Sequence, residues 1–118
     1  DGAFVAVHWD AGREGAGRGA LTVVTDHLGM QPLYRGAAEG AMLLASEVQA
    51  FARAGVLPAE PDPGAWGATL YFGHQIGPRT LLRGVTRVEA AQRLTFTAPD
   101  SEQTATHWAW PASRGLPD

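Results

Sequence analysis

The stretch T-D-H-L-G-M-Q-P-L-Y at residues 25–34 constrains the fold more than any other part of this chain. Asp26 can accept hydrogen bonds from the backbone that follows it, and Gly29 can adopt a positive φ angle at little cost. Pro32 restricts the residue before it, Gln31, to extended conformations. Together these residues predict a sharp turn that ends one strand and sets the start of the next.

Short apolar segments bounded by glycine and proline predict about seven strands. The first of them is apolar on both faces and is expected to be largely buried. The expected strands are residues 4–9, 21–25, 33–35, 42–45, 81–89 with a break at Gly84, 93–97 with Leu94 and Phe96 facing inward, and 103–108. The expected loops are a glycine-rich hairpin at 10–20, a loop around Gly36 and Gly40, and a turn at 98–102.

A first short helix is expected to begin at Ser46. Ser46 and Gln49 match an S-x-x-Q capping box, and Glu47 would lie where the helix dipole favours negative charge. Gly55 is a suitable end for this helix. Its apolar face is expected to be Val48, Phe51 and Ala52.

A second short helix is expected after Asp62, which would be its N-cap, with Pro63 in the first turn and Gly73 at the end. Trp66, Thr69 and Leu70 would share one face. The helices form a block between runs of strands, which favours an α+β fold over a doubly wound parallel sheet.

Composition narrows the possible functions. The 118 residues include 9 basic and 12 acidic side chains, for a formal net charge of −3, which argues against nucleic acid or an anionic membrane as the main partner. No apolar run approaches the roughly 20 residues that span a bilayer. Cysteine is absent, so a thiolate metal site or a cysteine nucleophile cannot come from these residues. We expect a cytoplasmic protein.

The local patterns that could carry chemistry each have a simpler explanation. The glycine loop lacks a lysine and precedes a strand, whereas a phosphate loop needs a following helix. The four histidines do not have the spacing of a zinc site. Ser46 is explained by its cap, and the aromatic residues by packing, with Trp108 and Trp110 the more suggestive pair. We therefore expect no catalytic, cofactor-binding or metal-binding residue in this chain.

Taken in order, several segments resemble the class II glutamine amidotransferase-like domain of the asparagine synthetase family. The matching segments are G-A-F-V-A-V-H-W-D, T-V-V-T-D-H-L-G-M-Q-P-L-Y, L-L-A-S-E-V-Q-A-F, D-P-G-A-W, L-Y-F-G-H-Q-I-G-P-R-T-L-L-R-G-V and T-H-W. The more specific pair is D-x-L-G-x-x-P-L-Y with A-S-E. Its motif residues, to which we assign a structural role, are Asp26, Gly29, Pro32, Tyr34, Ser46 and Glu47.

The resemblance implies an N-terminal-nucleophile (Ntn) type sandwich, here partial, made mainly of antiparallel sheet with short helices. Residues 1–110 would be a partial amidotransferase type 2-like domain, and residues 111–118 a tail or linker. In relatives this domain hydrolyses glutamine, and ammonia passes to a synthetase domain that uses ATP and magnesium. The cysteine nucleophile of those relatives lies upstream of the matched region. Asp1 cannot replace it, because no adjacent base would activate it.

The sequence departs from the family pattern at two places. Thr25 stands where an arginine is usual, and Glu89, Ala90 and Ala91 replace a proline-proline-glycine. Such changes are similar to those of β-lactam synthetases and lasso-peptide cyclases, which kept the architecture without the glutaminase duty. Asparagine synthesis and cyclisation both stay open as the activity of the parent ligase.

We expect a fragment of an asparagine synthetase-like, ATP-dependent amide-forming enzyme, inactive alone and acting as scaffold or interdomain contact. It would need no cofactor itself, and its partner would be a synthetase domain in cis or in trans. Exposed sheet edges would favour self-association or a complementary segment. The alternatives are a non-catalytic domain of a peptide or lactam cyclase, a stand-alone interaction module, and an unrelated small-molecule binding sandwich.

Overall fold

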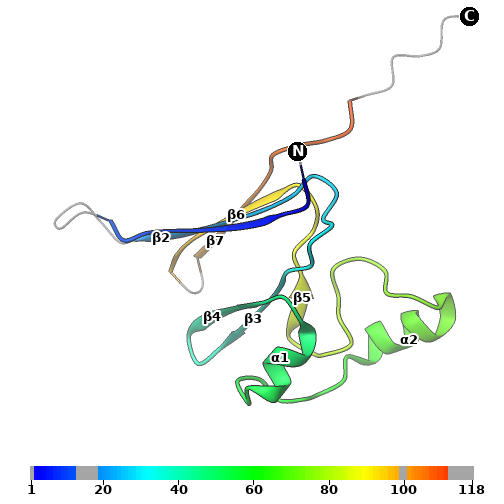
Figure 1. Cartoon of the computed structure of the whole chain (residues 1–118). Coiled ribbons are helices and arrows are strands. Elements are labelled where there is room, and N and C mark those ends of the chain that lie inside the picture. Colours follow the sequence, from blue (N-terminus) through cyan, green and yellow to red (C-terminus); the bar gives the residue numbers. More distant parts are fainter. Residues whose placement is uncertain (1, 13–18, 99–100, 112–118) are drawn as a thin grey trace, which may run out of the picture.

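Two open antiparallel sheets and two short helices make up the part of the chain that the computed structural model describes, which is residues 2–12, 19–98 and 101–111 (Figure 1). One sheet has the strand order β1-β2-β6-β7 and the other β4-β3-β5. The elements are β1 (Val5–Asp10), β2 (Ala20–Thr25), β3 (Tyr34–Ala38), β4 (Ala41–Ala45), α1 (Val48–Arg53), α2 (Pro63–Phe72), β5 (Val85–Arg87), β6 (Gln92–Ala98) and β7 (Ser101–Thr106).

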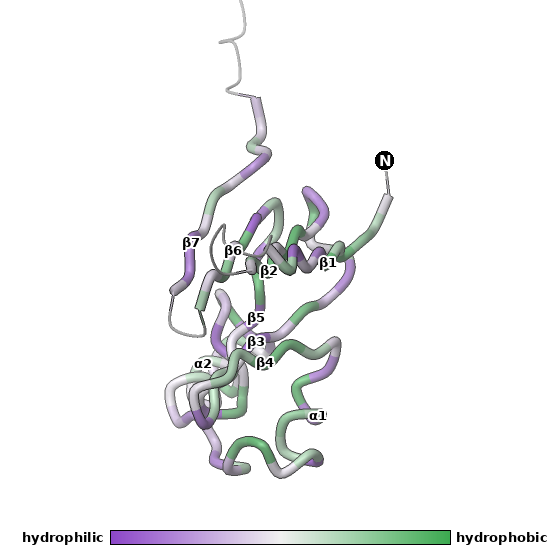
Figure 2. The backbone as a smooth tube through the Cα atoms, turned by 90° about the vertical axis from the view of Figure 1, so that its left-hand side faces the viewer, coloured by the Kyte–Doolittle hydropathy of each residue, from purple (hydrophilic) through white to green (hydrophobic). Residues whose placement is uncertain are grey.

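The expected α+β class is therefore confirmed, and the arrangement is consistent with a partial sandwich. Figure 2 shows the sheet of β1, β2, β6 and β7 lying above that of β3, β4 and β5. Neither sheet is closed into a barrel among the described strands. No helix in the described ranges is long and apolar enough to cross a membrane.

The hydrophobic core lies between the two sheets. Val23 on β2 pairs directly with Leu94 on β6, and both side chains are fully buried. Phe96 lies two residues further along β6 and points to the same side, which confirms the inward positions predicted from alternation. The rest of the cluster is Leu33 and Val88, with partly buried Val5, Leu21, Met42 and Leu44 packed against it.

The prediction that the first strand is largely buried is wrong. β1 is the edge strand of its sheet and pairs with β2 alone among the described strands. The Val7 side chain is 57% exposed and that of Trp9 is 63% exposed. Apolar composition on both faces predicts a buried strand only when other elements cover those faces, and no described element does so for β1.

The loop predicted around Gly36 and Gly40 is wrong for Gly36, which lies inside β3 and is buried. A Cβ atom on Gly36 would come within 2.9 Å of the Leu57 side chain and 3.3 Å of the Gly84 carbonyl oxygen, so a side chain here would be tightly packed. The turn is confined to Glu39 and Gly40, which both have positive φ angles, as a tight two-residue hairpin turn requires.

The predicted capping box of the first helix is also wrong. α1 begins at Val48, and its N-cap is Glu47 in extended conformation with no side-chain cap hydrogen bond. Ser46 lies one residue before that cap and is exposed. The inward face is as predicted, because Phe51 is buried, and Gly55 has a positive φ angle directly after the helix.

The N-cap of the second helix is confirmed. The Asp62 carboxylate accepts hydrogen bonds from the backbone N–H groups of Gly64 and Ala65, Pro63 is the first helical residue, and Gly73 ends the helix in left-handed conformation. The face predicted from Trp66, Thr69 and Leu70 is not the buried one. The buried residue of α2 is Ala65.

The later strands have different bounds from those predicted. β5 covers only Val85–Arg87, because Gly84 has a positive φ angle and ends the extended run before it. β6 extends to Ala98 and β7 begins at Ser101, so the predicted turn at 98–102 is wrong for Ala98, Ser101 and Glu102. Residues 13–18 of the glycine loop, 99–100 of that turn and 112–118 of the tail lie outside the described residues.

Replacing Leu94 by alanine should lower the free energy of unfolding by about 2–5 kcal/mol, because it leaves a cavity between the sheets. Urea denaturation followed by tryptophan fluorescence measures this change. The matched control is Val7→Ala, which shortens an exposed side chain on β1 and should cost much less. Equal losses in both variants would contradict the placement of the core.

Candidate functional site

The chain crosses between the two sheets twice, at residues 26–33 and 88–91, and the two crossings are bonded to each other. The first joins β2 to β3 and the second joins β5 to β6. The Ala91 N–H donates to the Asp26 carbonyl oxygen over 2.9 Å, and the Val88 N–H donates to the Leu33 carbonyl oxygen over 2.8 Å. The D-x-L-G motif therefore lies at the junction of the sheets.

The Asp26 side chain is 1% exposed and is surrounded by backbone donors. Its Oδ1 accepts from the N–H groups of Leu28 and Met30 at 3.0 and 3.1 Å. Its Oδ2 accepts from Met30 at 3.0 Å, and at longer range from Phe4 at 3.3 Å and Gln31 at 3.4 Å. Burial raises the pKa of this carboxyl, but the four N–H donors outweigh burial and lower the pKa from 3.8 to about 2.

Thr25 ties the junction to the second crossing and to the end of β7. Its hydroxyl donates to the Glu89 carbonyl oxygen over 2.8 Å and accepts from the Gln92 N–H over 3.1 Å. Its own carbonyl oxygen lies 2.9 Å from Nε2 of His107. Thr25, one of the residues that depart from the expected family pattern, is therefore buried and connects the two crossings through hydrogen bonds.

Gly29 and the second crossing pack closely against each other. Gly29 has a φ angle of +61°, and a Cβ atom there would lie 3.1 Å from the Ala90 side chain. The Arg87 guanidinium donates to the Gly29 carbonyl oxygen over 2.8 Å. The predicted turn is therefore confirmed, with Gly29 required both by its conformation and by the contact.

The other motif residues do not converge on a reactive group. Pro32 is exposed, and Tyr34 begins β3, where it pairs with Ala45 on one side and Arg87 on the other. Ser46 and Glu47 follow Ala45 and are exposed at the β4–α1 connection. Within the described residues, the structure gives these positions backbone roles.

Two concavities lie near these elements. One of about 240 Å³ is apolar and lies between the sheets, lined by Trp9, Gly19, Leu21, Met42, Phe96, Thr97 and Ala98. The other, of about 220 Å³, lies beside the junction and is lined by Leu28, Gly29, Gly77, Pro78, Arg87, Glu89 and Ala90. Neither lining includes a serine, cysteine or histidine among the described residues.

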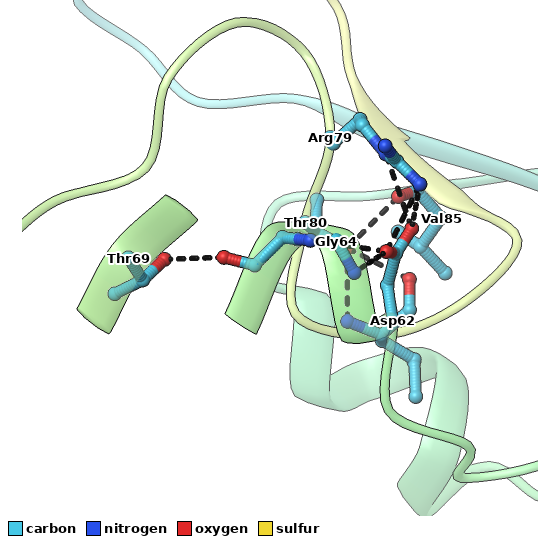
Figure 3. Close-up of polar contacts among 8 residues, drawn as sticks. Asp62, Gly64, Thr69, Arg79, Thr80 and Val85 are labelled. Carbon is cyan, nitrogen blue, oxygen red and sulfur yellow. Dashed lines mark hydrogen bonds and ion pairs between the residues drawn. The ribbon is translucent and has the colours of Figure 1, made fainter. Parts of the chain in front are cut away.

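A second polar cluster was only partly predicted. Arg79 binds the Asp62 carboxylate through Nε and a terminal nitrogen at 3.0–3.2 Å, a two-pronged pair that also steadies the start of α2 (Figure 3). The Ala65 N–H lowers the pKa of Asp62, burial raises it, and Arg79 lowers it further, for a net decrease. Beside it, the buried Thr80 hydroxyl donates to the Val85 carbonyl oxygen. The sequence predicted the cap but gave no signal for Arg79, 17 residues later.

His27 and His74 have different surroundings in the described structure. The His27 ring packs on Trp108 with ring centroids 5.2 Å apart, and Trp108 in turn packs edge-on against Trp110 at 4.9 Å. His74 is exposed, with Nδ1 3.1 Å from the Phe72 carbonyl oxygen. Among the described residues no group of three or more histidine, cysteine, aspartate or glutamate side chains could hold a metal ion.

The fold and the junction define an α+β domain of two antiparallel sheets whose signature motif is a backbone-bonded turn. A family model described as a glutamine amidotransferase domain matches residues 1–108, and the chain belongs to this family. No significant match is found among curated proteins or among solved structures. The amidotransferase part of the resemblance is thereby confirmed.

Asp26→Asn should destabilise the chain at neutral pH and flatten its response to acid. Because the pKa of Asp26 is about 2 in the folded chain and 3.8 ordinarily, its charged form stabilises the fold fully above about pH 5. That stabilisation is lost as the pH falls through 3.8 towards 2. Urea denaturation at pH 7, 5 and 3 measures how the free energy of unfolding changes with pH.

The control for this series is Glu47→Gln, which changes a carboxylate that makes no side-chain cap bond. It should keep the acid response of the parent chain. An Asp26→Asn variant that loses stability between pH 5 and 3 as steeply as the parent would contradict the assignment.

Ser46→Ala should change the free energy of unfolding by less than about 0.5 kcal/mol, since no cap bond is lost. Asp62→Ala removes the carboxylate oxygen that accepts from the Gly64 and Ala65 N–H groups, together with the Arg79 pair, and should lower the thermal midpoint clearly more. Thermal unfolding of the two variants compares the two helix caps. A larger drop of the thermal midpoint in Ser46→Ala than in Asp62→Ala would support the capping box that the sequence pattern predicted.

Proposed function

We propose that this chain is the scaffold and interdomain part of an ATP-dependent amide-forming enzyme similar to asparagine synthetases, and that it does not hydrolyse glutamine by itself. The observation that supports this most is the state of Asp26. A buried carboxylate that accepts from four backbone N–H groups is committed to holding the turn, and its low pKa makes it a poor proton acceptor.

Glutamine hydrolysis needs a nucleophile, a base that activates it and donors for the oxyanion. The 118 residues contain no cysteine, so the thiol of glutamine-using relatives is not among them. In the proposed enzyme, ATP and magnesium act in a synthetase domain, present in cis or in trans. This chain would supply a stable two-sheet body against which that domain is placed.

A cyclase is the second candidate parent, and one observation favours it. The two departures from the family pattern meet at the same place in the structure. Thr25 donates to the Glu89 carbonyl oxygen, and Ala91 adopts a positive φ angle while its N–H bonds Asp26. Both departures thus lie at the junction of the sheets, which supports a parent in which the domain kept its architecture without the glutaminase reaction.

The direct test is to incubate the purified chain with glutamine and measure the ammonia released. We expect no release above that of a heat-denatured sample, whereas a glutamine-hydrolysing amidotransferase in the same assay gives a clear signal. Turnover by this chain would contradict the proposal. The gene sequence before Asp1 separates the two parents, since a cysteine after the initiator methionine with a following Arg-Gly-Pro motif favours asparagine synthesis.

A further inference from the structure

Residues 63–78, which are α2 and the loop after it, form an apolar surface without a formal charge. The segment P-G-A-W-G-A-T-L-Y-F-G-H-Q-I-G-P contains no aspartate, glutamate, lysine or arginine, and its one histidine is His74. The exposed large side chains of this surface, which we call the α2 surface, are Trp66, Leu70, Tyr71, Phe72 and Ile76.

Helix α2 is apolar on all of its sides, yet only one side is buried against the rest of the chain. A soluble helix normally has one apolar stripe and a charged opposite face, and a helix that is apolar all round is normally buried. Here Ala65 is its buried residue, whereas Leu70 is 79% exposed and Tyr71 is 83% exposed. Figure 1 shows α2 standing to one side of the sheets, beyond α1.

The helix is nevertheless firmly fixed at its beginning. Arg79 binds the Asp62 carboxylate at one end of the segment (Figure 3), and the Asp62 N–H donates to the Leu81 carbonyl oxygen over 2.9 Å. The rings of Tyr71 and Phe72 pack edge to face with centroids 4.8 Å apart. The exposed side chains therefore belong to a helix whose start is held in place, which lowers the conformational entropy lost on association.

We propose that the α2 surface is the contact between two copies of this chain, related by a two-fold axis. In such an interface the same patch faces itself, so any formal charge on it would meet a like charge. An uncharged apolar segment avoids that repulsion. Its three aromatic residues are 44% (Trp66), 83% (Tyr71) and 54% (Phe72) exposed. Their exposed parts, together with Leu70 and Ile76, would contribute apolar area to the roughly 800 Å² that each partner buries in a stable interface.

The inference does not depend on the proposed function and differs from pairing at sheet edges. The edge strand β1 also has exposed apolar side chains, Val7 and Trp9, but it includes Asp10, which is exposed. Variants on the two surfaces therefore separate the two modes of association.

The test is sedimentation equilibrium of the full chain over a wide concentration range. We expect a dimer whose dissociation constant rises at least about tenfold in Tyr71→Asp and in Leu70→Asp, because each places two negative charges at the contact. Val7→Asp, an equally charged change on β1, should leave the dissociation constant within about twofold. Near-ultraviolet circular dichroism checks that each variant is folded.

A parent chain that stays monomeric at every concentration would overturn the proposal. It would also be overturned if Tyr71→Asp associates as tightly as the parent, or if Val7→Asp weakens association as much as Tyr71→Asp does. Dissociation by Val7→Asp alone would assign self-association to the sheet edge instead.

Discussion

The Asp26 carboxylate and the backbone N–H groups around it are the contact on which the rest of the described structure depends. The two sheets are joined by two crossings, and this carboxylate shapes the first of them while the Asp26 carbonyl oxygen binds the second through Ala91. Thr25 adds bonds from the preceding residue to Glu89 and Gln92. One buried anion and its neighbour thus set how β2, β3, β5 and β6 meet, and with them the core between the sheets.

The sequence predicted those features that are decided locally. The turn at Asp26 and Gly29, the Asp62 cap with Pro63, the ends of the helices at Gly55 and Gly73, and the inward positions of Leu94 and Phe96 each follow from residues a few positions apart. The family resemblance rested on the same motifs, and the amidotransferase domain assignment was confirmed.

The failures concern features that depend on distant parts of the chain. β1 was expected to be buried because its composition is apolar, but burial is set by which elements cover a strand. Gly36 was expected in a loop, yet it lies inside β3, where Leu57 and Gly84 approach it closely. The Ser46 cap matched a pattern, but the chain stays extended through Glu47. Arg79 could not be found because its partner is remote in sequence.

These results separate the motif from catalysis. Asp26 and Gly29 of the motif hold the junction together, and Thr25 and Glu89–Ala91 are bonded into the same junction. Under the proposed function, the amide-forming chemistry would lie in another domain of the enzyme. The exposed apolar helix α2 then becomes the part of the surface that is most in need of a partner.

Amide hydrogen exchange of the native chain, resolved by NMR, tests the central role of Asp26 most directly. The backbone N–H groups of Leu28 and Met30 lie in a turn outside any sheet ladder, so their protection depends on the Asp26 carboxylate. The account predicts that they exchange as slowly as the paired strand residues of β2 and β6. Exchange as fast as that of the exposed hairpin turn at Glu39 and Gly40 would contradict it.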